Sequence, residues 1–277
     1  MIENPLQSIK LQKIYYQLKN KSLIENIDTE FNASQINVIL GKNGAGKSTL
    51  LALLSKELMP SSGVITWQDI PLNQLSYSQL AQQRAVLPQL QSLVFSFSVK
   101  QLVELGVEVQ QLNSRDDMNQ IIHKVMQVCD VLHLADRDVV TLSGGEQKRA
   151  QLARVLAQIW PNDYFNEAVK QPFVGRWLLL DEWTNNLDLH HQQKLVKHFK
   201  SWAKKGLGIV MVLHDLNLSA QIADKVVLLN NAKLVKQGKV SEVLNVATIQ
   251  EELGLKVKVV TIEGIQHPVI LPAEMTS

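Results

Sequence analysis

This chain of 277 residues has a single cysteine, a small net charge and no long apolar run. The single cysteine, Cys129, excludes an internal disulfide and is typical of a reducing compartment, and its apolar helical surroundings predict a core position. A formal net charge of +2 lacks the basic excess of nucleic-acid-binding proteins, so we expect no nucleic-acid partner. No apolar run approaches the ~20 residues that a membrane-spanning helix needs. The first ten residues lack the apolar segment of a signal peptide. We therefore expect a cytosolic protein that reaches a membrane only through a partner.

Glycine is concentrated at residues 41–48, which read GKNGAGKS and match the P-loop pattern G-x-x-x-x-G-K-[ST]. An apolar run precedes this stretch and a helical pattern follows it, and in that context backbone N–H groups and a helix dipole bind phosphate. We expect Lys47 to reach the β- and γ-phosphates and the Ser48 hydroxyl to hold Mg²⁺. A glycine-rich strand–helix turn without a ligand is the alternative. The predicted phosphate-binding residues are Gly41, Lys42, Asn43, Gly44, Ala45, Gly46, Lys47, Ser48 and Thr49.

Before the P-loop, residues 9–40 alternate apolar and polar positions, which predicts short antiparallel strands joined by a polar turn at 19–21. Tyr15 and Tyr16 precede this turn, and an aromatic face can stack on a purine base. We favour Tyr15 for that role, but spacing alone leaves Tyr16 open, and a half-buried strand tyrosine is the alternative for both.

After the P-loop helix, the pattern predicts a strand at 64–67, a turn at 69–72, a polar helix at 78–84 and a strand ending at Gln89. A glutamine at a strand end can offer its amide oxygen to Mg²⁺ and hydrogen-bond the attacking water. Taken alone, Gln89 equally fits a solvated loop position.

From residue 99 to 134 the apolar spacing becomes helical, with a polar loop predicted at 110–117, so a helical insertion interrupts an α/β chain. The next predicted helix is at 148–160, and it is preceded by Ser143, Gly144, Gly145 and Glu146. Ser143 and Glu146 fit a capping box, which is the structural alternative. A capped helix start is also an anion site, and two such sites for one triphosphate predict a nucleotide shared between two copies of the chain.

Residues 161–176 show no periodicity and are interpreted as a surface excursion, and the buried strand WLLLDE follows at 177–182. Its two terminal carboxylates lie where α/β proteins bind ligands. We expect Asp181 to bind Mg²⁺ and Glu182 to orient or deprotonate the attacking water.

A polar helix is predicted at 189–204, in which the adjacent His190 and His191 face different sides and therefore form no metal pair. The next buried strand, at 209–213, ends at His214, and a histidine there could contact the γ-phosphate. A hairpin at 226–235 and two short strands at 257–262 and 269–271 complete the predicted elements.

Taken in chain order, these motifs resemble the nucleotide-binding subunits of ABC transporters. Walker A lies at 41–48, the signature LSGGE at 142–146 and Walker B at 178–181. The resemblance implies an α/β P-loop NTPase (ABC ATPase) with a RecA-like core, an antiparallel β subdomain and a helical subdomain. The implied parts of this single domain at 1–277 are the core with its β subdomain at 1–89 and 177–240, the helical subdomain at 90–160 and a C-terminal extension at 241–277.

The same resemblance implies an ATP hydrolase that uses ATP and Mg²⁺. Two copies would sandwich two ATP molecules, each between Walker A of one copy and the signature of the other, and hydrolysis would reset a pair of transmembrane permease subunits. The implied catalytic residues are Glu182, His214 and Gln89. The implied metal ligands are Ser48, Gln89 and Asp181. Beyond the P-loop, the implied nucleotide-binding residues are Tyr15, Ser143, Gly144, Gly145, Glu146 and the D-loop aspartate Asp188.

The stretches at 153–160, 176–182, 214–218 and 267–272 resemble the ATPases of bacterial haem (hemin) importers, within the iron–siderophore–cobalamin group. This implies a peripheral protein on the cytoplasmic face of the inner membrane that works indirectly with a periplasmic or surface haem-binding protein. Import of cobalamin or a ferric siderophore is the alternative, because nothing in this chain need touch the cargo. A soluble ABC-type ATPase is less favoured, because the chain has one cassette. A regulator that does not hydrolyse ATP would require the loss of Glu182 or His214, and both are present.

Two positions depart from the family pattern: Trp183 stands where proline is usual, and Asn185-Asn186 replaces a commoner small pair. We expect the chemistry to survive because the carboxylates are intact. Tryptophan adds bulk beside the catalytic strand end and lacks proline's rigidity, so the sequence leaves the geometry of the D-loop open. Residues 89–99 are expected to contact the membrane subunits.

Overall fold

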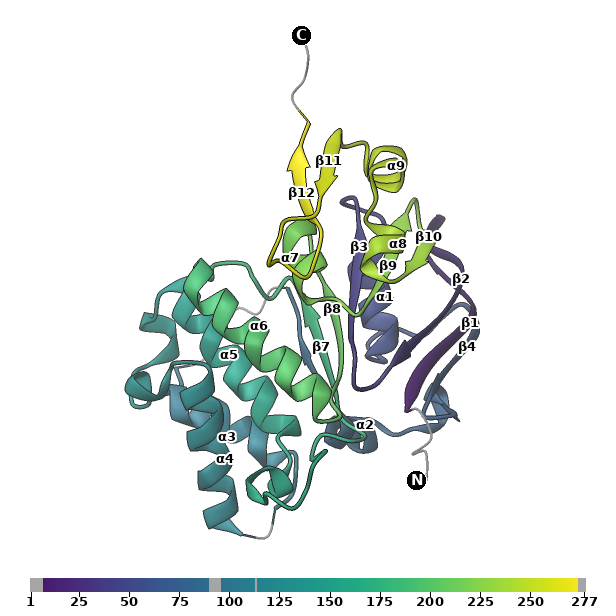
Figure 1. Cartoon of the computed structure of the whole chain (residues 1–277). Coiled ribbons are helices and arrows are strands. Elements are labelled where there is room, and N and C mark those ends of the chain that lie inside the picture. Colours follow the sequence, from purple (N-terminus) through teal and green to yellow (C-terminus); the bar gives the residue numbers. More distant parts are fainter. Residues whose placement is uncertain (1–6, 90–95, 113, 274–277) are drawn as a thin grey trace. The chain divides into compact units, whose positions relative to one another are not determined.

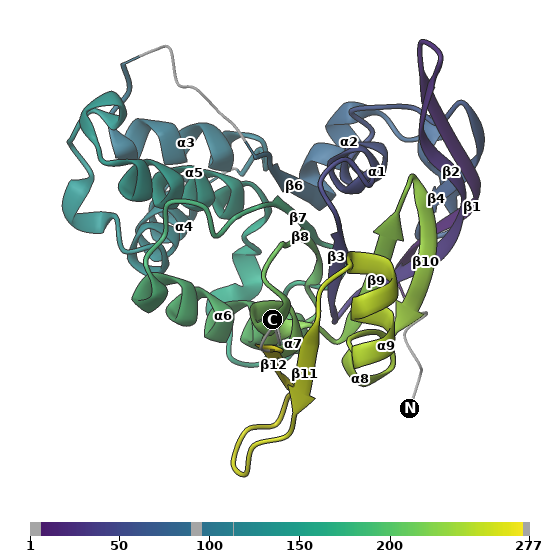
Figure 2. The same ribbon diagram turned by 90° about the horizontal axis from the view of Figure 1, so that it is seen from above.

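The computed structural model describes residues 7–89, 96–112 and 114–273. The chain divides into two compact units, the first from Met1–Gln74 and Val210–Ser277, the second from Leu75–Ile209. Each is described by itself below, and Figures 1 and 2 label their elements. Strand β8 (Gly208–Val212) crosses the boundary between the two units. The segment boundaries implied by the family resemblance stay a prediction.

The first unit is built mainly of strands. In sheet order, one sheet runs β2-β1-β4-β5 and a second runs β10-β9-β3-β8, while β11 and β12 form a separate hairpin. The first sheet is antiparallel, whereas β3 and β9 pair in parallel. Its elements besides β8 are β1 (Ser8–Leu18), β2 (Lys21–Asn32), β3 (Ile36–Gly41), α1 (Lys47–Leu54), β4 (Ser62–Trp67), β5 (Ile70–Pro71), α7 (Leu216–Ile222), β9 (Lys225–Asn230), β10 (Lys233–Gly238), α8 (Val240–Val243), α9 (Val246–Thr248), β11 (Val257–Val260) and β12 (Val269–Pro272).

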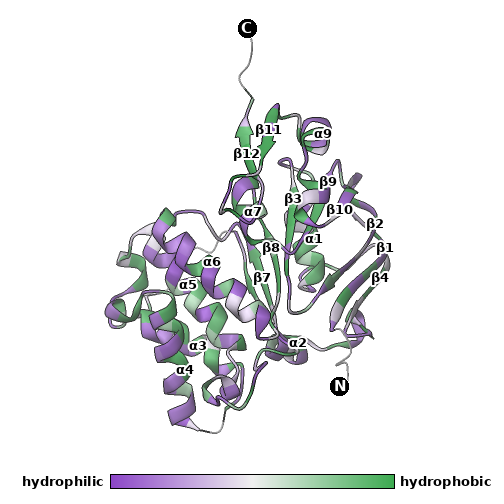
Figure 3. Ribbon diagram, in the orientation of Figure 1, coloured by the Kyte–Doolittle hydropathy of each residue, from purple (hydrophilic) through white to green (hydrophobic). Residues whose placement is uncertain are grey.

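The burial of these strands follows their hydrophobic pattern. In β1, Ile9 and Leu11 are buried because alternate residues of a half-covered strand face the core. Ile14 is also buried although it lies three residues after Leu11, because the pairing with β2 shifts register between them. Strand β3 is buried along Ile36–Leu40, as expected of a strand covered on both faces. Figure 3 shows β3 and β9 in the hydrophobic colour along most of their length. The predicted antiparallel pair in 9–40 is therefore confirmed.

The second unit is mostly helical around two parallel strands, β6 and β7, which pair with Leu87 opposite Leu180. Helices α3, α4 and α5 pack beside one another, as Figure 2 shows. Its elements are α2 (Tyr77–Gln83), β6 (Arg84–Leu87), α3 (Val99–Glu108), α4 (Arg115–Val128), α5 (Gly144–Ile159), β7 (Trp177–Asp181) and α6 (Leu189–Lys204). The predicted bounds of α6 are confirmed. Cys129, directly after α4, is buried as predicted, and burial raises the pKa of its thiol.

Several local expectations are wrong, among them the strand predicted to end at Gln89, since β6 ends at Leu87. Helix α5 begins at Gly144 rather than 148, because the capping box places its first turn on the glycines. Ile70–Pro71, in the predicted turn, pairs with β4 as strand β5. The segment 161–176 is not wholly a surface excursion, because Phe173 is fully buried. Its ring packs edge-on against Trp160, with 5.5 Å between ring centroids. Among the described residues, no helix is long and apolar enough to cross a bilayer.

Candidate functional site

The P-loop of the first unit links the end of β3 to the start of α1. Gly46 precedes α1 with a φ of 101°, in the left-handed region, and a Cβ there would lie 2.5 Å from the carbonyl oxygen of Leu23. Both the backbone conformation and the available space therefore require glycine at this position. The eight-residue helix α1 then presents its unpaired N–H groups beside the loop, which is the local geometry of an anion site.

Lys47 folds back over this loop and is only 6% exposed. Its Nζ donates hydrogen bonds to the carbonyl oxygens of Gly41 at 2.9 Å and Lys42 at 3.0 Å. An ammonium held at this position lies where phosphate oxygens would complete its coordination. Ser48 follows at the helix start with an exposed side chain. The loop therefore offers N–H groups, an ammonium and a hydroxyl, the chemistry that a nucleotide phosphate with Mg²⁺ requires.

Two further predicted residues belong to the same unit. His214 is exposed just after β8, a strand whose sheet neighbour is the P-loop strand β3, and Leu213 N–H donates to the carbonyl of Ile39. Tyr15 lies on β1 and is 36% exposed, whereas Tyr16 is half-buried. The greater exposure leaves the Tyr15 ring available for stacking, and its role stays a prediction.

Gln89, the signature, Asp181, Glu182 and Asp188 all belong to the second unit. Asp181 is the last residue of β7 and is 5% exposed. The predicted strand ends one residue early: Glu182 has a φ of 46°, so the backbone turns sharply and its side chain leaves the strand's alternation. A left-handed non-glycine residue is strained, and such strain gathers at functional positions.

The carboxylate of Glu182 is held by two side-chain amides. Its Oε2 accepts a hydrogen bond from Gln89 Nε2 and another from Asn185 Nδ2, each 2.7 Å long. Gln89 follows the end of β6, which pairs with β7, so the parallel strands bring these two predicted residues together. Two donors on one oxygen stabilise its negative charge and fix its direction.

Lys148 of α5 is half-buried near the same carboxylates. Burial lowers the pKa of its ammonium, and the charges of Asp181 and Glu182 partly oppose that effect. The two acids therefore have a cation of the same unit as counter-charge. Asp181 and Gln89 carry side-chain oxygens of the kind that Mg²⁺ prefers, and their role as metal ligands together with Ser48 stays a prediction.

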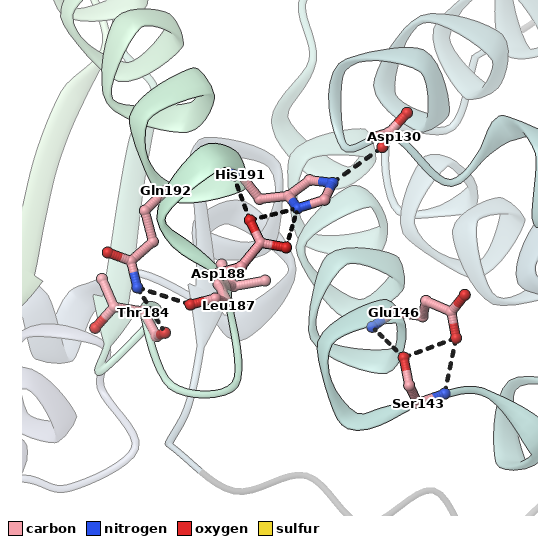
Figure 4. A network of polar contacts seen from close by, with 8 residues as sticks. All are labelled: Asp130, Ser143, Glu146, Thr184, Leu187, Asp188, His191 and Gln192. Atoms are coloured by element: carbon pink, nitrogen blue, oxygen red, sulfur yellow. Dashed lines mark hydrogen bonds and ion pairs between the residues drawn. The ribbon is translucent and has the colours of Figure 1, made fainter.

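The signature forms the capping box that the sequence left as the structural alternative. Glu146 N–H donates to Ser143 Oγ at 3.4 Å, while Ser143 N–H and Oγ both donate to Glu146 Oε2 at 2.8 Å (Figure 4). These Ser143 bonds hold the pKa of the Glu146 carboxyl below its usual value. A Cβ on Gly145 would lie 2.7 Å from the carbonyl oxygen of Asn186, so close packing within the chain also requires glycine here. The phosphate role of the signature remains a prediction.

Residues 184–188, here called the D-loop, join Glu182 to α6. Asp188 caps α6 by accepting from His191 N–H at 2.9 Å. That bond comes first among the causes that lower the pKa of the Asp188 carboxyl. Trp183, where the family pattern has proline, is fully buried with its ring edge-on to Phe199, 5.1 Å between centroids. Packing on α6 thus anchors the start of the D-loop in place of a rigid proline.

Sequence analysis missed the contacts made by Asn185, His191 and Lys148. Asn185 was noted only as a departure from the family pattern, and His191 was noted only as unsuited to pair with His190. The contact of His191 with Asp130 spans 61 residues, and that of Asn185 with Glu182 depends on the left-handed turn at Glu182, so no local pattern identifies them. The contact of His191 with Asp188 is local, and an Asp N-cap three residues before the histidine was its signal. The signal for Lys148 in the sequence is its place, since a basic residue two positions after the signature starts close to the nucleotide motifs.

Comparison with known proteins gives a consistent result. The family model for ABC transporters matches residues 24–160. The hemin import ATP-binding protein HmuV of Escherichia coli O157:H7 is 37% identical over 264 residues, which cover 95% of this chain and 98% of the relative. HmuV of Hahella chejuensis is also 37% identical, over 91% of this chain and 94% of its own.

Solved structures agree at the level of fold. The dimeric ABC transporter cassette MJ0796 superposes with a TM-score of 0.71 at 21% identity, covering 84% of this chain and 98% of that one. CbiO1 from Clostridium perfringens, part of the ABC transporter complex cbiONQ, gives a TM-score of 0.69 at 24% identity, covering 90% and 95%. The predicted α/β P-loop NTPase fold, with its antiparallel β and helical parts, is confirmed. The chain belongs to the ATP-binding proteins of ABC transporters.

Proposed function

We propose that this chain is the ATP-hydrolysing subunit that energises haem (hemin) import across the inner membrane. The observation that carries the proposal is the 37% identity to a hemin import ATP-binding protein over 95% of the chain. Intact Walker A lysine, Walker B carboxylates and signature residues support hydrolysis rather than nucleotide binding alone. Membership of the family supports two copies acting together, with ATP between Walker A of one and Ser143–Gly145 of the other.

In this proposal, Lys47 and the P-loop N–H groups bind the phosphates, and Tyr15 stacks on the adenine. Ser48, Asp181 and Gln89 provide oxygen ligands for Mg²⁺, which when bound supplies Lewis-acid polarisation of the phosphate oxygens. Glu182 accepts a hydrogen bond from the attacking water and orients it. His214 donates to the γ-phosphate. Asp188 contributes to the second copy's site as the family's D-loop aspartate.

The bond from Gln89 to Glu182, 2.7 Å long, adds a structural constraint on that chemistry. Gln89 can bind Mg²⁺ through its amide oxygen and keep its Nε2 on Glu182 only if one orientation of the amide suits both the metal and the carboxylate. Movement of Gln89 therefore changes the hydrogen bonding of the residue that orients water. Since residues 89–99 are proposed to contact the permease, this bond offers a link between the permease and hydrolysis. Residues 90–95 of that segment lie outside the described residues.

We place the chain on the cytoplasmic face of the inner membrane, held there by a pair of permease subunits. A periplasmic or surface haem-binding protein would deliver cargo to the permease without touching this chain. Cobalamin or a ferric siderophore is the alternative cargo.

The test is steady-state ATPase activity of the chain assembled with its permease in liposomes, with and without haem-loaded binding protein. Stimulation by haem, abolished in Glu182→Gln, supports both the mechanism and the cargo. Activity that ignores haem but responds to cobalamin or a ferric siderophore keeps the mechanism and overturns the cargo. ATPase activity that no permease changes would favour a soluble ABC-type enzyme.

A further inference from the structure

The D-loop is tied to the rest of the second unit by one histidine. His191 Nδ1 lies 2.8 Å from Asp188 Oδ2 and 2.9 Å from Oδ1, and Nε2 lies 3.0 Å from Asp130 Oδ2 (Figure 4). Asp188 ends the D-loop, whereas Asp130 follows the C-terminal end of α4, 61 residues from His191 in sequence. The imidazole therefore bridges two carboxylates from separate elements.

Both ring nitrogens face carboxylate oxygens, which accept hydrogen bonds and cannot donate them. A neutral imidazole can donate from only one nitrogen, so the bridge is complete only with the doubly protonated ring. The hydrogen bond from His191 is the leading reason that the pKa of the Asp130 carboxyl lies below its usual value. The histidine side chain is only 17% exposed, whereas the Asp130 and Asp188 side chains are 46% and 63% exposed, so water competes at the carboxylates more than at the ring. The positive charges of Lys194 and Arg149 also lower the pKa of Asp130, so cations as well as carboxylates surround the bridge.

The neighbouring residue makes a second tie to the same loop. Gln192 Nε2 donates to the carbonyl oxygen of Leu187 at 2.9 Å and more weakly to that of Thr184 at 3.4 Å. Two consecutive residues in the first turn of α6 thus hold the beginning and the end of the D-loop. Within the loop, Asn185 donates to Glu182 Oε2 at 2.7 Å. A continuous set of contacts therefore runs from Asp130 through the D-loop to Glu182.

We propose that His191 is a positioning residue for ATP hydrolysis: by joining Asp188 to Asp130 it fixes the D-loop, and through it the Asn185 amide against the Glu182 carboxylate. This inference rests on the proposed role of Glu182.

A metal site is a poorer account of the cluster formed by His191, Asp188 and Asp130. The described residues contain no group of three or more His, Cys, Asp or Glu side chains arranged for a metal ion. Both ring nitrogens are also already engaged.

The first measurement compares kcat and KM for ATP in the full chain carrying His191→Ala, His191→Gln or Asp130→Asn. The control is His190→Ala, which removes an exposed ring that lies edge-on to His191, with 5.6 Å between centroids, and leaves the bonds of His191 to both carboxylates in place. We expect His191→Ala to lower kcat by about 3- to 10-fold, within the range of coupling effects in contact networks, with KM nearly unchanged. His191→Gln, which has one amide donor group for two separated carboxylates, is expected to fall between this variant and the parent. Asp130→Asn is expected to lower kcat in the same direction, and the control to match the parent.

The second measurement is a double-mutant cycle with Asn185→Ala. If His191 acts through Asn185, the double variant has nearly the kcat of Asn185→Ala alone, because the path is already broken. Three results would each overturn the inference. The first is that the two substitutions lower kcat by factors that multiply in the double variant. The others are an unchanged kcat in His191→Ala and a drop in ATP affinity equal to the drop in kcat. Glu182→Gln measured in parallel separates the two failures. If that variant keeps normal turnover, the proposed role of Glu182 fails, and the positioning role of His191 fails with it. If it is inactive and His191→Ala is not impaired, only the positioning role fails.

Discussion

The carboxylate of Glu182 accepts a hydrogen bond from the side-chain amide of Gln89, 93 residues earlier in the chain, with 2.7 Å between Nε2 and Oε2. Asn185 donates to the same oxygen from the D-loop. The proposed water-orienting group is therefore held between the segment that follows β6 and the segment that leads into α6. Any motion that separates these two segments changes its hydrogen bonding.

Replacing Glu182 with glutamine should abolish hydrolysis while leaving nucleotide binding intact. The amide keeps the size of the side chain and an oxygen that can accept from Gln89 and Asn185, but it cannot take a proton from water. We expect kcat to fall by at least ~100-fold, the usual contribution of general-base catalysis, with ATP-dependent dimers accumulating. The exposed Glu167→Gln is the control. Near-normal turnover in Glu182→Gln would remove this residue from the proposed chemistry.

Replacing Lys47 with alanine should weaken ATP binding. The variant loses the ammonium that bonds to the carbonyls of Gly41 and Lys42 and that would meet the phosphates. We expect the dissociation constant for ATP to rise at least ~10-fold, since a charged hydrogen bond contributes roughly 1.5–3 kcal/mol. Calorimetric titration of the variant beside the exposed-lysine control Lys197→Ala measures this. Equal affinities in the two variants would contradict the phosphate role.

Truncating Trp183 should mainly destabilise the second unit, with a smaller direct effect on ATP hydrolysis. Its fully buried ring packs edge-on against Phe199. Trp183→Ala is expected to lower the free energy of unfolding by about 3–5 kcal/mol, whereas Trp183→Phe keeps an aromatic ring and loses less. Chemical denaturation followed by circular dichroism measures both. Equal stability of the alanine variant and the parent would show that the ring contributes no packing energy.

The C-terminal hairpin β11–β12 should come loose when Asn217 is changed. This side chain on α7 donates to the carbonyl of Ile270 at 2.9 Å and accepts from its N–H at 2.7 Å, so it pairs with the backbone as a neighbouring strand would. Asn217→Ala removes both bonds, and Asn217→Asp keeps only the acceptor. We expect faster limited proteolysis between residues 255 and 273 in both variants. Cleavage at the parent rate would mean that other contacts suffice to hold the hairpin.

Stability at acid pH should depend on His191. The pKa values of the Asp130 and Asp188 carboxyls lie below the ordinary value of 3.8, chiefly through hydrogen bonds from His191. A depressed folded-state pKa gives stability that is present above 3.8 and is lost as pH falls through the folded-state values. Urea midpoints measured from pH 6 to pH 2.5 should therefore decline less steeply in His191→Ala than in the parent. Parallel declines in the two proteins would show that the histidine does not stabilise the ionised carboxyls.

Much of this protein was determined by short stretches of sequence. The P-loop, the bounds of α6, the β9–β10 hairpin and the capping box at Ser143 are local, because each depends on residues within a few positions of one another. Their hydrogen bonds and backbone preferences are set by neighbours in the chain, so a pattern suffices to predict them. The family resemblance follows from the order of such local motifs.

Tertiary structure alone decided which side chains meet. Gln89 reaches Glu182 because β6 pairs with β7, and His191 reaches Asp130 because the start of α6 lies against the end of α4. Trp183 is a core residue because Phe199 lies beside it, whereas its position in the motif indicated only added bulk and lost rigidity. Contacts between residues 61 or 93 positions apart depend on the packing of whole elements, and no single stretch of sequence encodes that packing.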